Sequence, residues 1–422
     1  GFGFSVGSDS GNYLRVANNP KIIFEEDRFV EGRKFVPGRV SISRPGALFT
    51  VFLISKPIEF FWNKMNLFSE SVHSGLKKSL NHAYKISGID QTIEDSVPNL
   101  SEFYPTYISF LIFNLLVIFF TFNFYCKSIS ISIYEINSYS KLVLWLGLFF
   151  IINDISKKYI VSPNPGIFNL FSASLTLYAC SSLDQIGDNK KKLVIFSAVI
   201  GFFNLFYAMF ICPFITFLTI YLKIEIFDKK KGFFGILRDY KFFIISLVLF
   251  ILPYSIWLLL VKFHFNFTFR HYGLNDYPGF AALVLDFKNT LLIVKHNSYK
   301  GLRIGFLSTL PIFIIFSLLF LKQVCFDNNK INLFKKNYLL VAVLYMILVS
   351  AFFSSYGVFN SRHAVGCFLI FLPFVSLLVE NIDKHYKKNF VKFVFILFSF
   401  YAIFLARKSF PYGEGIIVNP FS

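Results

Sequence analysis

Long apolar stretches with almost no charge are the feature that most constrains the fold of this chain. YISFLIFNLLVIFFTFNFYC (107–126) and FFIISLVLFILPYSIWLLLV (242–261) each run for 20 residues without Asp, Glu, Lys or Arg. A helix of about 20 apolar residues crosses the roughly 30 Å hydrocarbon layer of a bilayer. Only 16% of the 422 residues are charged, whereas soluble domains have about 25%. We therefore predict an all-α, polytopic membrane protein.

Apolar windows of this kind predict about ten membrane-spanning helices. The window from 193 to 227 is too long for one span, and we divide it at Pro213 because proline ends a helix at the residue before it. The chain begins with Gly1 and the apolar GFGFSV, so we expect a further helix to precede this sequence. The predicted spans are 107–126, 142–160, 166–183, 193–210, 213–227, 242–261, 304–321, 338–353, 364–378 and 391–406.

The net charge of +18 comes largely from lysines in short loops between these spans. Lysine and arginine collect in the cytoplasmic loops of membrane proteins, so this charge indicates orientation and excludes nucleic acid as a partner. Dividing the long window at Pro213 puts NKKK (189–192) and DKKK (228–231) on the same, cytoplasmic side. With ten spans, both ends of the chain are then extracytoplasmic. The five cysteines show no spacing typical of a disulfide framework or a zinc site.

The order of these segments predicts three parts. Residues 1–104 form a first extracytoplasmic loop, 105–407 a transmembrane bundle with an external loop at 262–303, and 408–422 an extracytoplasmic tail. Within the first loop, the apolar stretch 44–62 is interrupted by Lys56, Pro57 and Glu59. Such a segment favours a helix lying in the membrane interface, because a crossing here would turn the lysine clusters outward. The fold class therefore includes interfacial helices in the first loop.

Polar residues that this topology places on the outer face, or inside a span, are the candidates for chemistry. The opening segment GSDSGNYLRVANNP (7–20) has an isolated carboxylate at Asp9, and NSRHAVG (360–366) begins a span with two basic residues. An acid inside a membrane span is functional by default. The candidates are Asp9, Tyr13, Arg44, Arg270, Lys295, Arg362 and His363, with a possible second acidic set of Glu25, Glu26, Asp27 and Asp154.

Four short stretches resemble motifs of the GT-C superfamily, the polytopic glycosyltransferases that take a sugar from a polyprenyl-phosphate carrier. SDSGNYLRVANNP (8–20) resembles their Asp-x-x-x-Tyr-x-x-x-Ala pattern. SRPGALFTVFL (43–53) is similar to their Arg-Pro interfacial helix. SRHAVGCFLIFLPF (361–374) resembles a late Arg-Tyr segment with His363 in place of the aromatic residue, and SPNPGIFNLFSASLTLY (162–178) is similar to the helix after their third external turn. Many members have a pair of acidic residues in the first loop. In this chain the acids are not adjacent, because Asp9 stands alone and Glu25, Glu26 and Asp27 lie further along.

The resemblance implies an inverting sugar transfer at the outer face of the bacterial inner membrane. Asp9 would be the general base that accepts the proton of the acceptor hydroxyl, and Tyr13 would place a hydroxyl beside the substrate. Arg44, Arg270, Lys295, Arg362 and His363 would bind substrate, the basic groups stabilising the leaving phosphate. The implied partners are a polyprenyl-phosphate-linked sugar donor, a glycan, lipid or protein acceptor, and the lipid bilayer.

Structural interpretations stay open for several of these residues. Asp9 is also a suitable N-cap for a helix that starts near Asn12. FEEDRF (24–29) is typical of a solvated charged turn. Arg362 fits a side chain that extends from a helix end into the headgroup layer, and the position of His363 beside it favours a structural role. The basic residues from Arg33 to Arg44 also fit an anchor to anionic lipid, and Asp154 fits a cap or a pairing within the bundle.

Two other functions share the predicted topology. An O-antigen polymerase or ligase would use arginines of a large late external loop, the place that the 262–303 loop takes here. A transporter would show repeated halves with matching helix breaks, and the break at Pro213 has no counterpart. No cofactor is assigned: the chain has no Asp-x-Asp motif, and a divalent cation is left open.

Overall fold

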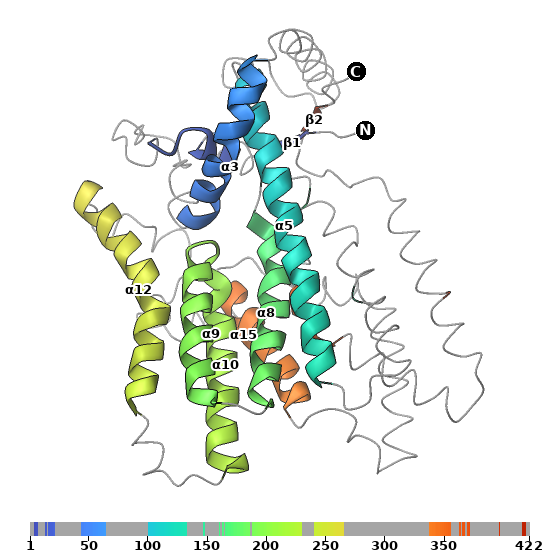
Figure 1. The fold of residues 1–422 in the computed structure, drawn as a ribbon, viewed down its shortest axis with the longest axis vertical. Coiled ribbons are helices and arrows are strands. Elements are labelled where there is room, and N and C mark those ends of the chain that lie inside the picture. The colour runs from blue at the N-terminus through green and yellow to red at the C-terminus, as the bar shows by residue number, and fades with distance from the viewer. Residues whose placement is uncertain are drawn as a thin grey trace.

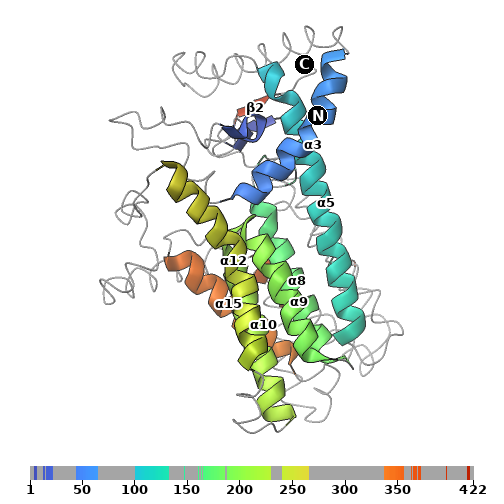
Figure 2. The ribbon, with the colours of Figure 1, turned by 60° about the vertical axis from the view of Figure 1, so that its left-hand side comes forward.

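The computed structural model of the chain describes residues 4–6, 13–14, 16–21, 44–64, 100–132, 147, 160, 163, 165–185, 188–229, 240–265, 337–355, 363, 365–367, 369–371, 396 and 416–418. Within these residues the architecture is helical, with one short pair of strands (Figure 1). Long helices lie side by side as a bundle, and one further helix and the strand pair lie at one end of it (Figure 2).

Helix α8 (Phe168–Leu183), preceded by the short η3 (Pro165–Ile167), is the centre of this bundle. In its span 94% of the residues are buried, against 17% in α12 (Tyr240–Phe265), which lies at the periphery. The hydroxyl of Thr176 donates to the carbonyl of Ser172 (2.6 Å), and Ser174 does the same to Phe171 (3.0 Å). Because these hydroxyls are satisfied by the helix backbone, α8 tolerates burial on all sides.

The remaining long helices pack around α8 in neighbouring pairs. Helix α5 (Leu100–Ser132) and α10 (Ile211–Lys223), which continues into the π-helical η5 (Ile224–Asp228), both contact α8. Helix α15 (Tyr338–Ser355) lies against α8 and α10, and α9 (Asn189–Asn204) against α12. Apolar side chains such as Ile244, Ile251 and Leu259 remain exposed on α12, which is typical of a helix that faces lipid.

Four of these helical segments are long and apolar enough to cross a membrane. They are Tyr104–Ile131, Pro165–Leu183, Ala208–Phe227 and Tyr240–Leu260, with Tyr338–Phe353 as a shorter apolar helix. All five coincide with predicted spans, and α9 overlaps a sixth. The helical membrane architecture is therefore confirmed in the described part of the chain. The spans predicted at 142–160, 304–321, 364–378 and 391–406 lie largely or wholly outside the described residues, so the total of ten stays a prediction.

The predicted division of the 193–227 window is confirmed, but its position is corrected. Helix α9 ends at Asn204, and a turn leads through Tyr207 and the short η4 (Ala208–Phe210) into α10. Pro213 lies inside the first turn of α10, where its missing N–H has no helical partner to lose. The proline therefore starts the second helix instead of ending the first.

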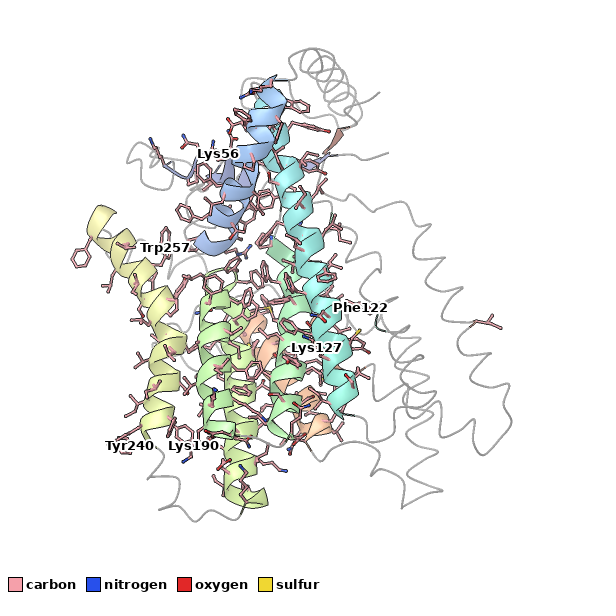
Figure 3. All side chains as sticks on the ribbon, in the orientation of Figure 1. Lys56, Phe122, Lys127, Lys190, Tyr240 and Trp257 are labelled. Atoms are coloured by element: carbon pink, nitrogen blue, oxygen red, sulfur yellow. The ribbon has the colours of Figure 1, made fainter. Side chains whose placement is uncertain are left out.

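The hairpin of α9 and α10 brings Lys190–Lys192 and Lys229 to the same end of the bundle, as the charge argument requires. Lys229 is close enough to Lys192 to act on it electrostatically. Lys190 and Tyr240 lie at this end, and Lys56 lies at the opposite one (Figure 3). We call them the lysine end (Lys190, Lys192, Lys229) and the Arg44 end, where Arg44 and the start of the interfacial helix lie.

A pair of short strands, which the all-α prediction did not include, joins the two ends of the chain. Strand β1 (Phe4–Val6) pairs antiparallel with β2 (Ile416–Val418), with Ser5 opposite Ile417. The pair lies beyond the bundle on the side of the Arg44 end (Figure 2). Two paired segments must be on the same side of a membrane, so an even number of crossings separates them. This agrees with the predicted topology, in which both ends are extracytoplasmic.

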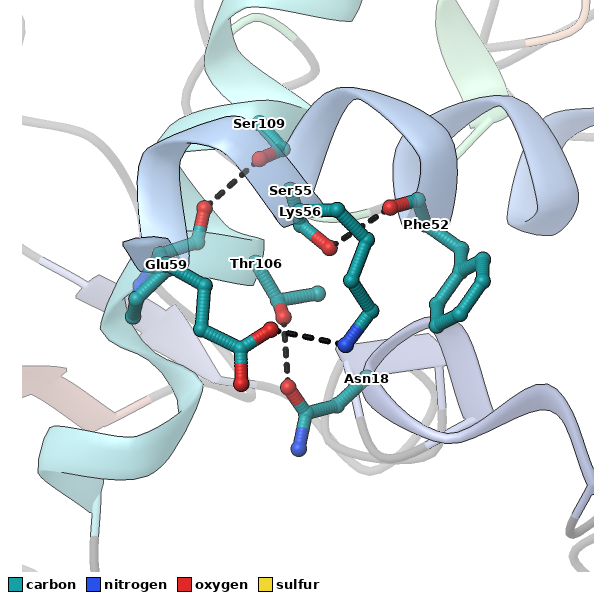
Figure 4. Close-up of polar contacts among 8 residues, drawn as sticks. Asn18, Phe52, Ser55, Lys56, Glu59, Thr106 and Ser109 are labelled. Atoms are coloured by element: carbon teal, nitrogen blue, oxygen red, sulfur yellow. Dashed lines mark hydrogen bonds and ion pairs between the residues drawn. The ribbon is translucent and has the colours of Figure 1, made fainter. Parts of the chain in front are cut away.

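Helix α3 (Pro45–Lys64) is the predicted interfacial helix, and within the described residues it is not among the segments that qualify as spans. It buries Ala47, Leu48 and Val51 and packs on α5. The ion pair of Lys56 with Glu59 (2.7 Å) lies on this helix, as the close-up in Figure 4 shows. The charged residues of α3, Lys56, Glu59 and Lys64, lie in its second half among apolar side chains, as expected for a helix that borders both water and lipid.

We expect a cysteine at position 64 to be labelled from outside intact cells and one at 191 to be protected. Both Lys64→Cys and Lys191→Cys replace an exposed lysine, so the two variants differ in the end of the molecule at which the cysteine lies. A membrane-impermeant maleimide is the reagent, and permeabilised cells give the control in which both positions react. Labelling of the 191 variant in intact cells would invert the proposed orientation.

Gly201 sets the separation of α9 and α12, and its substitution is expected to destabilise the bundle. A Cβ at Gly201 would meet the backbone oxygen of Leu249 at 2.6 Å and the Cα of Phe250 at 2.6 Å. Gly201→Leu should therefore lower the free energy of unfolding by about 1–3 kcal/mol, measured by thermal unfolding of the purified protein. Ile195→Leu, at an exposed position of the same helix, is the matched control and should unfold like the wild type.

Candidate functional site

Arg44 lies where the interfacial helix meets the bundle. The N–H of Gly46 donates to the carbonyl of Leu205 (3.0 Å), in the turn between α9 and η4. A Cβ at Gly46 would meet the ring of Phe206 at 2.6 Å, so the approach requires glycine. This backbone contact, two residues after Arg44, fixes the position from which the arginine side chain extends.

The guanidinium of Arg44 lies between two tyrosines from different parts of the chain. One of its N–H groups donates to the hydroxyl of Tyr13. The guanidinium carbon is 5.6 Å from the ring centre of Tyr13 and 4.6 Å from that of Tyr207. Arg44 is half-buried, and no carboxylate of the described residues lies within ion-pair distance of it. Four of the five N–H donors of a guanidinium therefore have no hydrogen-bond partner in the described part of the chain.

Tyr13 belongs to a short helical segment that is held against α5. Tyr13 and Ala17, one helical turn apart, are 1% and 0% exposed. Next to Ala17, the side-chain oxygen of Asn18 accepts a hydrogen bond from the Thr106 hydroxyl (2.8 Å; Figure 4). The small Ala17 permits this close packing, and the Tyr13 hydroxyl is directed at Arg44.

A row of aromatic rings continues from Arg44 to His363. The ring of Tyr207 contacts that of Phe353 near the end of α15, with centroids 6.2 Å apart. Phe353 and His363 stack almost parallel, at 3.7 Å and 10°. His363 is 2% exposed, so its imidazole is part of the packed wall. Three further residues on, Gly366 approaches α8 so closely that a Cβ would lie 2.3 Å from the backbone oxygen of Asn169.

The lysine end has a different character, because several of its described charged side chains have polar partners within the protein. Lys223 donates to the side-chain oxygen of Asn337 (2.6 Å), whose amide donates to Asp184 (3.1 Å). Lys192 donates to the carbonyls of Ser182 (2.7 Å) and Gln185 (3.0 Å) at the end of α8, which satisfies helix-terminal carbonyls. Burial and then the nearby Lys229 lower the pKa of Lys192, although Asp184 and Asp188 oppose the shift. Lys190 lies over the ring of Phe242 at 5.3 Å, but among the described residues of this end no cation lies between two aromatic rings.

Three of the sequence candidates, Tyr13, Arg44 and His363, lie in this one row of contacts at the Arg44 end. His363 is more than 300 residues from the other two in the chain. The candidates that lie outside the described residues are Asp9, Glu25, Glu26, Asp27, Asp154, Arg270, Lys295 and Arg362.

Sequence reasoning missed the two residues that connect the row, Tyr207 and Phe353. Both are aromatic residues inside long apolar windows, where nothing marks them among the sixty phenylalanines and 22 tyrosines. With the helix break at Leu205–Tyr207 instead of at Pro213, Tyr207 would have been recognised as the tyrosine of an external turn. Among the residues that the structure describes, no three His, Cys, Asp or Glu side chains gather in a way that could hold a metal ion.

No protein-family model, no curated protein and no solved structure matches the chain. The geometry at the Arg44 end is that of a half-buried cation flanked by aromatic rings, whose remaining donors have no hydrogen-bond partner among the described residues. Such a group is suited to bind an anion, because charge-assisted hydrogen bonds from arginine to phosphate or carboxylate are strong and often bidentate.

Proposed function

We propose that the protein is a membrane glycosyltransferase of the GT-C type. It would transfer a sugar from a polyprenyl-phosphate-linked donor to an acceptor on the extracytoplasmic face, with inversion and with a carboxylate as general base. Arg44 would bind the phosphate that leaves, and Asp9 would accept the acceptor proton.

The observation that carries the proposal is the Arg44 guanidinium, held between Tyr13 and Tyr207 without a carboxylate partner in the described residues. An arginine in partly buried surroundings is expected to have an anionic partner, and a ligand phosphate would supply it. A lipid-linked donor places its phosphate at the membrane surface, where an interfacial helix such as α3 is expected to join the bundle.

The position of the site along the membrane normal also supports this proposal. Arg44 lies next to the turn that ends α9, about 24 Å from the lysine end at 1.5 Å per helical residue over Asn189–Asn204. If the lysine end is cytoplasmic, Arg44 is at the outer surface. A donor on the outer leaflet would reach it without crossing the bilayer.

The test is sugar transfer by the purified full chain in lipid vesicles. The vesicles contain a radiolabelled polyprenyl-phosphate sugar, and product is followed with glycan, lipid and peptide acceptors in turn. Sugar moved to an acceptor with release of polyprenyl phosphate is the expected result. Movement of intact substrate across the vesicle membrane without transfer would make the protein a transporter. Extension of a glycan that stays on its pyrophosphate carrier would make it a polymerase.

A further inference from the structure

The single hydrogen bond to Tyr13 is not enough to orient the Arg44 side chain. An arginine side chain loses about 2 kcal/mol of rotamer entropy when it is fixed. Its remaining donors must still face the ligand. We propose that Tyr207 is the positioning residue for Arg44, and that it holds the guanidinium ready to bind the phosphate of a prenyl-type lipid. The inference rests on the proposed function.

The geometry of the contact suits this role. The guanidinium carbon of Arg44 lies 4.6 Å from the ring centre of Tyr207, closer than the 5.6 Å to Tyr13. Cation–π attraction acts within about 6 Å of a ring centre and is stronger where water is excluded. A ring that attracts the centre of the guanidinium uses none of its N–H groups. Tyr207 therefore restrains Arg44 and leaves the donors for an anion.

Tyr207 is itself held firmly. Its side chain is 5% exposed, and its ring packs on Phe353. Its N–H donates to the carbonyl of Phe203 (3.1 Å), and its carbonyl accepts from the N–H of Phe210 (3.2 Å). Both ends of the turn are thus tied to helices. The hydrogen bond of Gly46 to Leu205 joins this same turn to α3, so the tyrosine and the arginine are fixed to one piece of backbone.

The arrangement distinguishes Tyr207 from Tyr13. The ring centre of Tyr13 is farther from the guanidinium carbon than that of Tyr207, and the Tyr13 hydroxyl accepts a hydrogen bond from one guanidinium N–H. Tyr207 makes contact through its ring, so a phenylalanine at that position keeps the interaction and an aliphatic residue loses it. This difference between ring and hydroxyl makes the role testable.

The experiment measures binding of farnesyl phosphate to the purified full chain by isothermal titration, with farnesol as the phosphate-free control. We expect Tyr207→Leu to weaken farnesyl phosphate binding about twofold to thirtyfold, the range of cation–π energies. Tyr207→Phe should recover most of the affinity. Farnesol binding should be unchanged in both. Tyr240→Leu, the same substitution at an exposed position of the lysine end, is the matched control and should bind like the wild type.

A double-mutant cycle with Arg44→Ala decides whether Tyr207 acts through the arginine. If it does, Tyr207→Leu has no further effect on farnesyl phosphate binding once Arg44 is alanine. An equal loss in both backgrounds, or equal losses for farnesol and farnesyl phosphate, would overturn the inference by making Tyr207 a packing residue. The cycle can also show coupling between Tyr207 and Arg44 in farnesyl phosphate binding while the wild-type protein transfers no sugar. That result would support the role of Tyr207 and overturn the proposed function instead.

Discussion

Asp9→Asn is expected to reduce sugar transfer by about 100-fold or more while leaving the protein folded and inserted in the membrane. The expected loss is that of a general base, because asparagine keeps the shape of aspartate and cannot accept a proton at neutral pH. Asparagine also serves as an N-cap as well as aspartate does. The substitution therefore separates a catalytic Asp9 from a capping one. The measurement is the initial rate of transfer from a labelled polyprenyl-phosphate sugar.

Asp188→Asn is the matched control for this substitution. Asp188 is the N-cap of α9 at the lysine end, and its carboxylate accepts a hydrogen bond from the N–H of Lys190 (2.9 Å). Because this aspartate caps a helix and is far from Arg44, its replacement by asparagine should preserve both activity and thermal stability. If Asp9→Asn behaves like Asp188→Asn, Asp9 is not the base, and Glu25, Glu26 and Asp27 become the acids to test.

The case for Asp9 combines sequence spacing with the position of Tyr13. Asp9 precedes Tyr13 by four residues, the separation that puts two side chains on one face of a helix. Residues 13, 14 and 16–18 are helical, and the hydroxyl of Tyr13 contacts Arg44. On this spacing we expect the carboxylate about one helical turn from Tyr13, whose hydroxyl contacts Arg44. With Arg44 as the proposed leaving-group cation, base and cation would flank one sugar.

The sequence predicted the parts of the fold that depend on hydrophobicity and charge. Twenty-residue windows without charge located α5 and α12, since a bilayer selects for length and apolarity alone. The lysine clusters required a break between 193 and 227, and Lys192 and Lys229 do lie at one end. Lys56, Pro57 and Glu59 interrupt the apolar stretch 44–62 and excluded it from the predicted spans, and α3 is indeed not among the described helices that qualify.

The details that the sequence did not predict depend on contacts between distant segments. The helix break was placed at Pro213 because proline usually ends a helix, yet a proline in the first turn starts one. The pairing of Phe4–Val6 with Ile416–Val418 has no local signal, since three-residue strands are too short to show alternation. Tyr207 lies beside Arg44 because the backbone of Gly46 contacts that of Leu205. These two residues are 159 positions apart in the sequence, and local periodicity does not predict a contact between such distant residues.

Arg44→Ala is expected to lower kcat/KM for the donor by about 100- to 1000-fold, the loss seen when one preorganised donor to a developing negative charge is removed. The guanidinium is half-buried and is held by Tyr13 and Tyr207, so its orientation does not have to be established at the moment of reaction. Arg44→Lys should recover part of the activity, since a point charge remains while the bidentate fork is lost. Initial rates at several donor concentrations separate the effects on kcat and KM.

Lys56→Ala supplies the control on the same helix. Lys56 is exposed and pairs with Glu59 at 2.7 Å, and an exposed ion pair of this kind contributes about 0–1 kcal/mol to stability. Its removal should leave kcat/KM within a fewfold of the wild type, which would show that loss of a cation from α3 is not itself harmful. Equal effects of Lys56→Ala and Arg44→Ala would indicate attraction of α3 to anionic lipid. A wild-type rate for Arg44→Ala would mean that the donor phosphate does not bind at this end of the bundle, because the described residues there offer no second guanidinium between aromatic rings.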